Sequence, residues 1–188
     1  GGVFSKIGFP CGTRLEVKAK LTKLVRGGFP AIWQMPMGAP EWPRGGEIDL
    51  MEWVQRTPLQ IYQTVHTYYI NGANGSAGVT NKNPDKNFDV TKDHVYAVER
   101  TEKELIFYVD GKETWRYGNQ YLDEGKLQYP FCEYPFNIIL NFSLGGELNG
   151  RMTWPGEICD EDLPGEMWVD WVRVVSLNNE NQSDTGDK

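Results

Sequence analysis

The sequence predicts an all-β protein whose strands form an antiparallel sandwich or barrel. Short segments that alternate apolar and polar residues recur along the chain, and clusters of turn residues separate them. Segments with helical periodicity are nearly absent, and the Asp110-Gly111 pair between two alternating segments is typical of a β-hairpin. Many short strands joined by turns favour sandwiches and barrels.

The alternating segments give the expected strands in chain order. Residues 14–21 alternate for eight positions and predict a half-buried strand. Further strands are expected at residues 29–34, 47–52, 59–70, 94–100, 104–109, 112–116, 136–144 and 167–175. A loop is expected where Gly, Asn and Lys accumulate, at residues 71–89, and an irregular segment or short helix at residues 117–133.

Length and charge limit the possible classes of protein. With 188 residues, the chain is expected to form one domain over residues 1–176, followed by a polar and disordered tail at residues 177–188. The net charge of −7 argues against binding to nucleic acid, whose phosphates require a basic surface. Because no run of 18 apolar residues occurs, insertion into a membrane is not expected.

Three cysteines, Cys11, Cys132 and Cys159, show no spacing typical of a metal site. One disulfide at most can form among them, and the sequence leaves the pair open. Free buried thiols are the expected state.

Three carboxylates occur within six residues, at Glu47, Asp49 and Glu52, among apolar neighbours. Strict alternation in a strand places Glu47 and Asp49 on one face and sends Glu52 to the other. One extra residue between Asp49 and Glu52, accommodated as a β-bulge, would bring all three carboxylates to one face.

Such a row suits acid/base or nucleophilic chemistry on an acetal. Three neighbouring carboxylates repel one another, so at least one is expected to keep its proton near neutral pH. Two other interpretations remain open at this point. The acidic face could simply be solvated, or the carboxylates could bind calcium.

The segments around this row resemble glycoside hydrolase family 16, which includes laminarinases, mixed-linkage β-glucanases, agarases and carrageenases. The resemblance starts from Phe-Pro-Ala-Ile-Trp at residues 29–33, Trp42-Pro43 and Gly-Glu-Ile-Asp-Leu-Met-Glu at residues 46–52. Further matching segments follow in order at His66-Thr67 and at residues 107–111, 139–146 and 169–174. The resemblance covers residues 12–174, and its Glu-x-Asp-x-x-Glu spacing is the bulged variant of the family motif.

The resemblance implies a jelly-roll sandwich with a concave substrate cleft and a secreted, cell-surface or periplasmic protein. It implies a retaining endo-β-glucanase that acts on β-1,3- or mixed β-1,3/1,4-linked glucan without a cofactor. Glu47 would be the nucleophile and Glu52 the general acid/base, with Asp49 between them and the two glutamate carboxyl groups about 5–5.5 Å apart. The alternatives are a non-catalytic β-glucan-binding module and an agarase of the same family.

Five further residues are expected to contact sugar. Trp33 and Trp42 match family positions that stack on sugar rings, although tryptophans at such positions also fill cores. His66 would hydrogen-bond within the acid cluster or to sugar, or else be a packed histidine. Arg14 and Asn141 could reach sugar hydroxyls, and a solvated arginine and a backbone-bonded asparagine are the competing interpretations.

Two other expectations follow from the resemblance. Many members bind a structural calcium, and Asp170 matches one of the ligands. Domains of the family usually carry further strands before the segment that matches residue 12, so we expect a sheet edge that a partner chain could cover.

Overall fold

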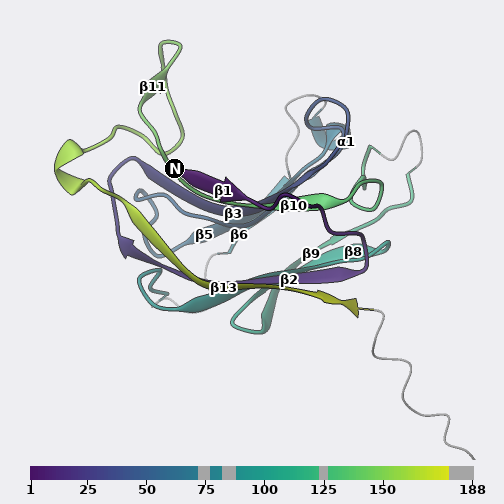
Figure 1. Cartoon of the computed structure of the whole chain (residues 1–188). Helices are drawn as coiled ribbons and strands as arrows, with labels where there is room; N and C mark the ends of the chain where they lie inside the picture. Colours follow the sequence, from purple (N-terminus) through teal and green to yellow (C-terminus); the bar gives the residue numbers. More distant parts are fainter. Residues whose placement is uncertain (72–76, 82–87, 123–126, 178–188) are drawn as a thin grey trace, which may run out of the picture.

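Two antiparallel sheets pack face to face in the computed structural model and enclose one apolar core (Figure 1). The structure describes residues 1–71, 77–81, 88–122 and 127–177. Among these residues, no helix is long and apolar enough to cross a membrane. The architecture is the jelly-roll sandwich that the sequence predicts.

The first sheet has six strands, and the second has five. The first sheet has the order β1 (Gly2–Phe4), β10 (Phe136–Leu144), β3 (Gly28–Pro36), β4 (Glu47–Glu52), β5 (Ile61–His66) and β6 (Ala77–Asn81). The second sheet has the order β13 (Glu166–Ser176), β2 (Thr13–Lys23), β7 (His94–Arg100), β8 (Glu104–Val109) and β9 (Lys112–Gly118). A small hairpin, β11 (Glu147–Leu148) with β12 (Arg151–Met152), and the 3-10 turn η1 (Asp160–Asp162) lie between β10 and β13.

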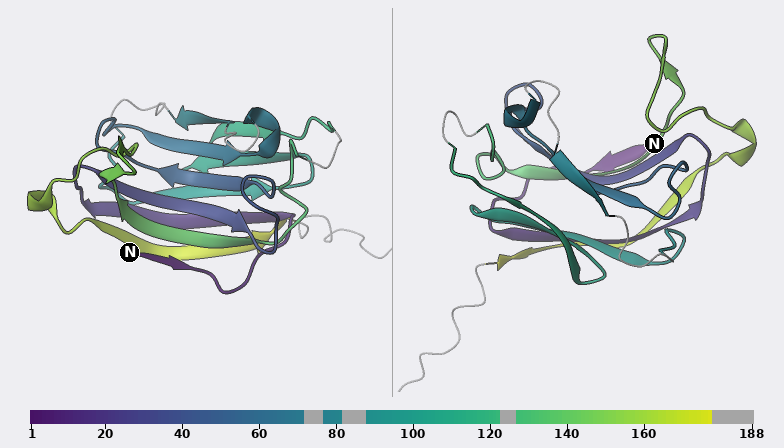
Figure 2. Two further views of the ribbon diagram at one scale, coloured as in Figure 1. Left: turned by 90° about the horizontal axis from the view of Figure 1, so that it is seen from above. Right: turned by 180° about the vertical axis from the view of Figure 1, so that it is seen from behind.

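The hairpin and the short helix α1 (Tyr68–Asn71) rise on the same side of the six-stranded sheet, away from the core. Figures 1 and 2 show them at opposite ends of the strands, with the outer face of the sheet between them.

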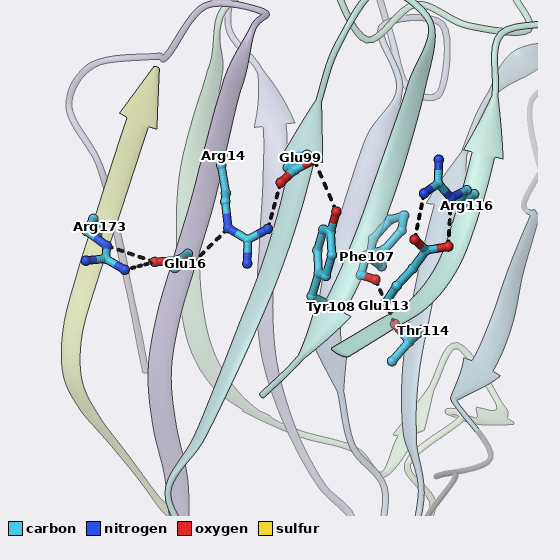
Figure 3. Close-up of polar contacts among 9 residues, drawn as sticks. All are labelled: Arg14, Glu16, Glu99, Phe107, Tyr108, Glu113, Thr114, Arg116 and Arg173. Carbon is cyan, nitrogen blue, oxygen red and sulfur yellow. Dashed lines mark hydrogen bonds and ion pairs between the residues drawn. The ribbon is translucent and has the colours of Figure 1, made fainter. Parts of the chain in front are cut away.

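Alternation along β2 determines which side chains enter the core. Leu15, Val17 and the other apolar residues of β2 are buried, because they face the first sheet. The polar residues between them point outward, where Arg14 bonds to Glu16 and Glu99 at 2.8 Å each and Arg173 also pairs with Glu16 (Figure 3). The outer face of the second sheet is therefore covered by a charged network.

Two expected segments differ in the structure. The strand expected at residues 59–70 ends at His66, where the chain leaves the sheet and forms α1, whose Tyr69 N–H donates to the carbonyl of Leu127 at 3.2 Å. The loop expected at residues 71–89 contains β6, which pairs with β5 although its sequence lacks clear periodicity. Residues 72–76, 82–87 and 178–188, the last covering nearly all of the predicted tail, lie outside the described part.

The expectation of free thiols is wrong for two of the three cysteines. Cys11 and Cys132 form a disulfide, with their Cα atoms 5.0 Å apart. The buried Arg100 explains why the two segments meet, since its guanidinium donates to the carbonyls of Phe9 and Pro10 on one side and of Phe131 on the other. Cys159 remains a half-buried thiol.

Candidate active site

The acidic strand β4 contains the bulge that the sequence predicts. Asp49 and Glu52 pair with Thr64 and Tyr62 of β5, so three steps along β4 match two steps along β5. The pairing with β3 shifts at the same place. Leu50 is fully buried and Met51 almost fully, because the extra residue lets two consecutive side chains enter the core.

The bulge brings Glu47, Asp49 and Glu52 to the same outer face of the six-stranded sheet. All three line a cleft of about 300 Å³. The strand enters this face through Gly46, whose φ of +83° and whose contact with the Phe131 ring, 2.7 Å from an ideal Cβ, require a glycine.

Glu47 accepts a hydrogen bond from an exposed indole. The Nε1–H of Trp42 donates to its Oε2 atom over 2.5 Å. Trp42 is 41% exposed, and its ring centroid lies 5.6 Å from that of His66. Trp42 and His66 therefore form a wall at the Glu47 end of the acid row.

Asp49 lies in the middle of the row and is only 2% exposed. Burial raises its pKa well above the usual value for aspartate, and the charge of Glu47 and a hydrogen bond with Glu47 raise it further. Its Oδ2 atom lies 3.4 Å from His66 Nε2 and has no hydrogen-bond partner among the described residues. Asp49 is therefore the carboxyl group in the middle of the row that tends to keep its proton.

Glu52 is the second carboxyl group that keeps its proton. Burial, followed by the electrostatic influence of the neighbouring Asp49 and Glu47 carboxyl groups, raises its pKa to about 8. His66 and then Thr64, which donates to Oε2 over 3.4 Å, act on this pKa in the opposite direction. A neutral Glu52 can donate a proton at physiological pH, which is what a general acid requires.

Trp33 and Asn141 belong to the floor of the cleft. The Nε1–H of Trp33 donates to Asn141 Oδ1 over 2.6 Å, and Asn141 Nδ2 donates to Ser143 Oγ over 2.9 Å. These bonds fix the indole and the amide on the face that carries the acids. Four of the five residues predicted to contact sugar thus lie at the cleft, where His66 and Trp42 form the wall and Trp33 and Asn141 the floor.

Arg14 is the exception, and its prediction as a sugar-contacting residue is wrong. It lies on β2 in the other sheet and faces outward, because its neighbour Leu15 occupies the core side of the strand. Figure 3 shows its guanidinium between Glu16 and Glu99. An alternating segment reveals the two faces of a strand but not the sheet to which the strand belongs.

The structure also adds cleft residues that were not predicted. They are apolar or small side chains in the register of the predicted ones: Phe29, Ala31, Ile139 and Ser143. The alternation of β3 and β10 could have identified them, since they share a face with Trp33 and Asn141. Trp154, which packs against Phe29, lies in a loop, where no periodicity indicates a face.

Two places in the structure bear on metal binding. Glu47, Asp49 and His66 each offer a ligand atom within 4.8 Å of the others, but the raised pKa of Asp49 means that a proton competes with a cation there. Asp170 accepts a hydrogen bond from Lys18 at 2.8 Å and belongs to no such group in the described part of the chain. The calcium site stays a prediction.

Comparisons with known proteins identify the family of the chain. Residues 5–173 match the model of glycosyl hydrolases family 16. The β-glucanase of Rhodothermus marinus is 35% identical over 169 residues, which cover 86% of this chain and 56% of that protein. The keratan-sulfate endo-1,4-β-galactosidase of Sphingobacterium multivorum is 35% identical over 167 residues, which cover 87% of this chain and 36% of that protein.

One solved structure is much more similar. It comes from work on endo-acting O-glycanases that prominent members of the human gut microbiota express to initiate mucin breakdown. It is 89% identical, with a TM-score of 0.90, and the match covers 95% of this chain and 74% of that chain. The two curated relatives above are considerably longer than this chain, which spans 56% and 36% of them. The fold, the bulged acid row and the match over residues 5–173 together show that this chain belongs to glycosyl hydrolase family 16.

Proposed function

We propose that the chain is a retaining endo-acting glycoside hydrolase that cleaves β-linked glycans by double displacement. One observation carries this proposal: Glu47, Asp49 and Glu52 lie along one cleft, with Glu47 held by an indole N–H and Glu52 protonated. Retaining glycosidases need such a pair, a nucleophile and a proton donor. The cleft lies on the outer face of the six-stranded sheet, and an open face of this kind suits attack within a polymer.

Glu47 and Glu52 carry out the reaction in two steps. The Glu47 carboxylate attacks the anomeric carbon and forms a glycosyl ester, while the C1–O bond breaks and Glu52 gives its proton to the departing oxygen. Glu52 then takes a proton from water, the water oxygen attacks the anomeric carbon, and Glu47 leaves as a carboxylate. Asp49 orients Glu47 through the hydrogen bond between them.

The favoured substrate is a neutral O-glycan of the mucin type. The O-glycanase structure is 89% identical to this chain, whereas the curated β-glucanase is 35% identical. No lysine or arginine occurs among the described residues that line the cleft, and the three acids there would repel sulfate groups. A neutral chain therefore fits better than a sulfated one such as keratan sulfate.

A β-1,3- or mixed-linkage glucan is the second candidate. The sequence motif resembles that of the glucanase branch, and the β-glucanase of Rhodothermus marinus is similar over 86% of this chain. Both candidates use the same acids and differ only in the sugars that the cleft accepts.

We also propose that the protein works outside the cytoplasm, either secreted, on the cell surface or in the periplasm. The enzyme would encounter a polymeric glycan outside the cytoplasm. Disulfides such as Cys11–Cys132 form and persist in oxidising compartments.

Two experiments test the proposal. Mucin O-glycans, keratan sulfate, laminarin, barley β-glucan and agarose are incubated side by side with the protein, and the released oligosaccharides are identified by mass spectrometry. We expect internal cleavage of the mucin O-glycans and no product from heavily sulfated chains. Cleavage of laminarin or barley glucan alone would favour the second candidate, and a lack of any product would contradict the enzymatic proposal.

The second experiment tests the roles of the acids. Glu47→Gln and Glu52→Gln should each remove nearly all hydrolysis, and azide should restore turnover to Glu47→Ala with an α-configured glycosyl azide as the product. Proton NMR of the first wild-type products should show the β-anomer. An initial α-anomer would exclude the retaining mechanism.

A further inference from the structure

Trp154 is an exposed tryptophan that packs beside the cleft, against Phe29 and Tyr62. Its ring centroid lies 4.8 Å from that of Tyr62 and 5.3 Å from that of Phe29, and both contacts are edge-to-face. Phe29 lines the cleft, and Tyr62 stands opposite Glu52 across the β4–β5 pair. Trp154 nevertheless remains 40% exposed, so part of the indole is open to a ligand.

The loop that carries Trp154 is held closed by hydrogen bonds. Gly146 N–H donates to the Gly156 carbonyl at 2.7 Å, and Thr153 donates to the Gly146 carbonyl with both its N–H, at 2.9 Å, and its hydroxyl, at 2.7 Å. These bonds lie at the base of the β11–β12 hairpin, which rises above the sheet (Figure 1). The indole is therefore held in place although it is exposed, which reduces the entropy lost when it binds a ligand.

The position of Trp154 along the acid row is determined by its neighbours. Tyr62 is paired with Glu52, and its hydroxyl lies 3.1 Å from Thr57 Oγ1, which orients the ring. Trp42 occupies the other end of the row beside Glu47. One exposed indole thus lies at each end, and the small side chain of Ala31, opposite Glu52 on β3, leaves space beside the acid.

We propose that Trp154 is a sugar-stacking platform for the departing sugar, on the leaving-group side of the cleft. The proposal rests on the function proposed above. Glu52 protonates the oxygen that leaves with this sugar, so the ring that carries the oxygen lies on the side of Glu52 that faces away from Glu47. The C–H face of a neutral sugar packs well on an indole ring, an amphipathic surface of large area. The same position receives an acceptor sugar when the glycosyl ester reacts with a sugar hydroxyl instead of water.

The test uses this double role of the position. Wild type, Trp154→Ala and Trp154→Phe are compared on the polymer that the wild type cleaves best, with N-acetyllactosamine or laminaribiose added as acceptor. We expect Trp154→Ala to lower kcat/KM by about tenfold, the loss typical of one aromatic contact. The ratio of transfer products to hydrolysis products should fall by a similar factor, while Trp154→Phe keeps most of both.

Trp168→Ala is the matched control, because Trp168 is 60% exposed and lies on β13 in the other sheet. It should change neither quantity, and thermal melting checks the fold of each variant. A normal kcat/KM in Trp154→Ala would overturn the platform. A lower kcat/KM with an unchanged ratio of transfer to hydrolysis would overturn it as well, because the indole would then only support the fold or bind the sugar that becomes attached to Glu47. A wild type that cleaves none of the polymers would instead overturn the proposed function, and the platform with it.

Discussion

Trp42 donates its indole N–H to Glu47 over 2.5 Å, and this bond joins the loop before β4 to the first acid of the row. A similar bond occurs far from the cleft, where Trp168 Nε1–H donates to Glu166 over 2.6 Å. The described part of the chain therefore contains two exposed Trp–Glu hydrogen bonds, and one of them lies at the candidate active site. The pair makes a matched experiment possible.

Trp42→Phe should lower kcat/KM by roughly 10- to 100-fold. The substitution keeps an aromatic ring but removes the N–H, and a hydrogen bond to a charged group contributes about 1.5–3 kcal/mol. Steady-state kinetics on the preferred polymer measures the change, with Trp168→Phe as the control that should behave like the wild type. Equal activity of the two variants would show that the bond to Glu47 does not support the reaction.

The activity should fall as the pH rises through about 8. The general acid must carry its proton when substrate binds, and the pKa of Glu52 in the free protein is raised to about 8. Initial rates at low substrate concentration between pH 5 and 10 report kcat/KM and this pKa. If the basic limb of the kcat/KM profile were centred two pH units lower, the proton would belong to a group other than Glu52.

Glu52→Gln should make the protein more stable at pH 8 by roughly 4 kcal/mol. The folded pKa of about 8 exceeds the usual value of 4.5, so the folded state binds the proton more tightly than the unfolded state does. Wild-type stability is therefore fully present below about pH 4.5 and is lost progressively as the pH rises through 8. The amide has no proton to lose and escapes this penalty.

Denaturant unfolding of both proteins at pH 4 and pH 8 measures this difference. The gain should be confined to pH 8, and Glu41→Gln, a substitution at a mostly exposed side chain, should show no gain at either pH. A loss of stability in Glu52→Gln at pH 8 would mean that the glutamate is ionised and well solvated in the folded protein.

Replacing Cys11 and Cys132 by serine should lower the free energy of unfolding by about 2–5 kcal/mol. The disulfide spans 121 residues of sequence, so its loss releases a long loop in the unfolded chain. Unfolding curves with and without a reductant give the value, and Cys159→Ser, which breaks no disulfide, is the control. A wild type whose stability is insensitive to reductant would contradict the pairing.

Arg14→Ala should leave KM and kcat within about twofold of the wild type and cost about 1–2 kcal/mol of stability. Its guanidinium bonds to Glu16 and Glu99 on the outer face of the second sheet. When Arg14 is removed, Glu16 still pairs with Arg173. Kinetics and unfolding of the same preparation separate the two effects. A raised KM with unchanged stability would show that Arg14 contacts the substrate after all.

The class of fold and the row of three acids on one face could be predicted from the sequence. Alternation is a local property, because successive side chains in a strand point to opposite faces, and it gave β7, β8 and β10 to the residue and β2 to within two residues at each end. The bulge was also predictable, since a regular strand would have buried an unpaired Glu52 in the core.

Which strands share a sheet and which loops meet could be learned only from the three-dimensional structure. Arg14 and Trp33 each lie on an alternating strand, yet one faces solvent on the second sheet and the other faces the cleft on the first. The Cys11–Cys132 pair and the approach of Trp154 to Tyr62 join segments 121 and 92 residues apart, and no local pattern specifies such contacts. They arise because burying one apolar face of each sheet against the other brings distant loops together, and so the composition of the cleft walls depends on packing, which periodicity does not encode.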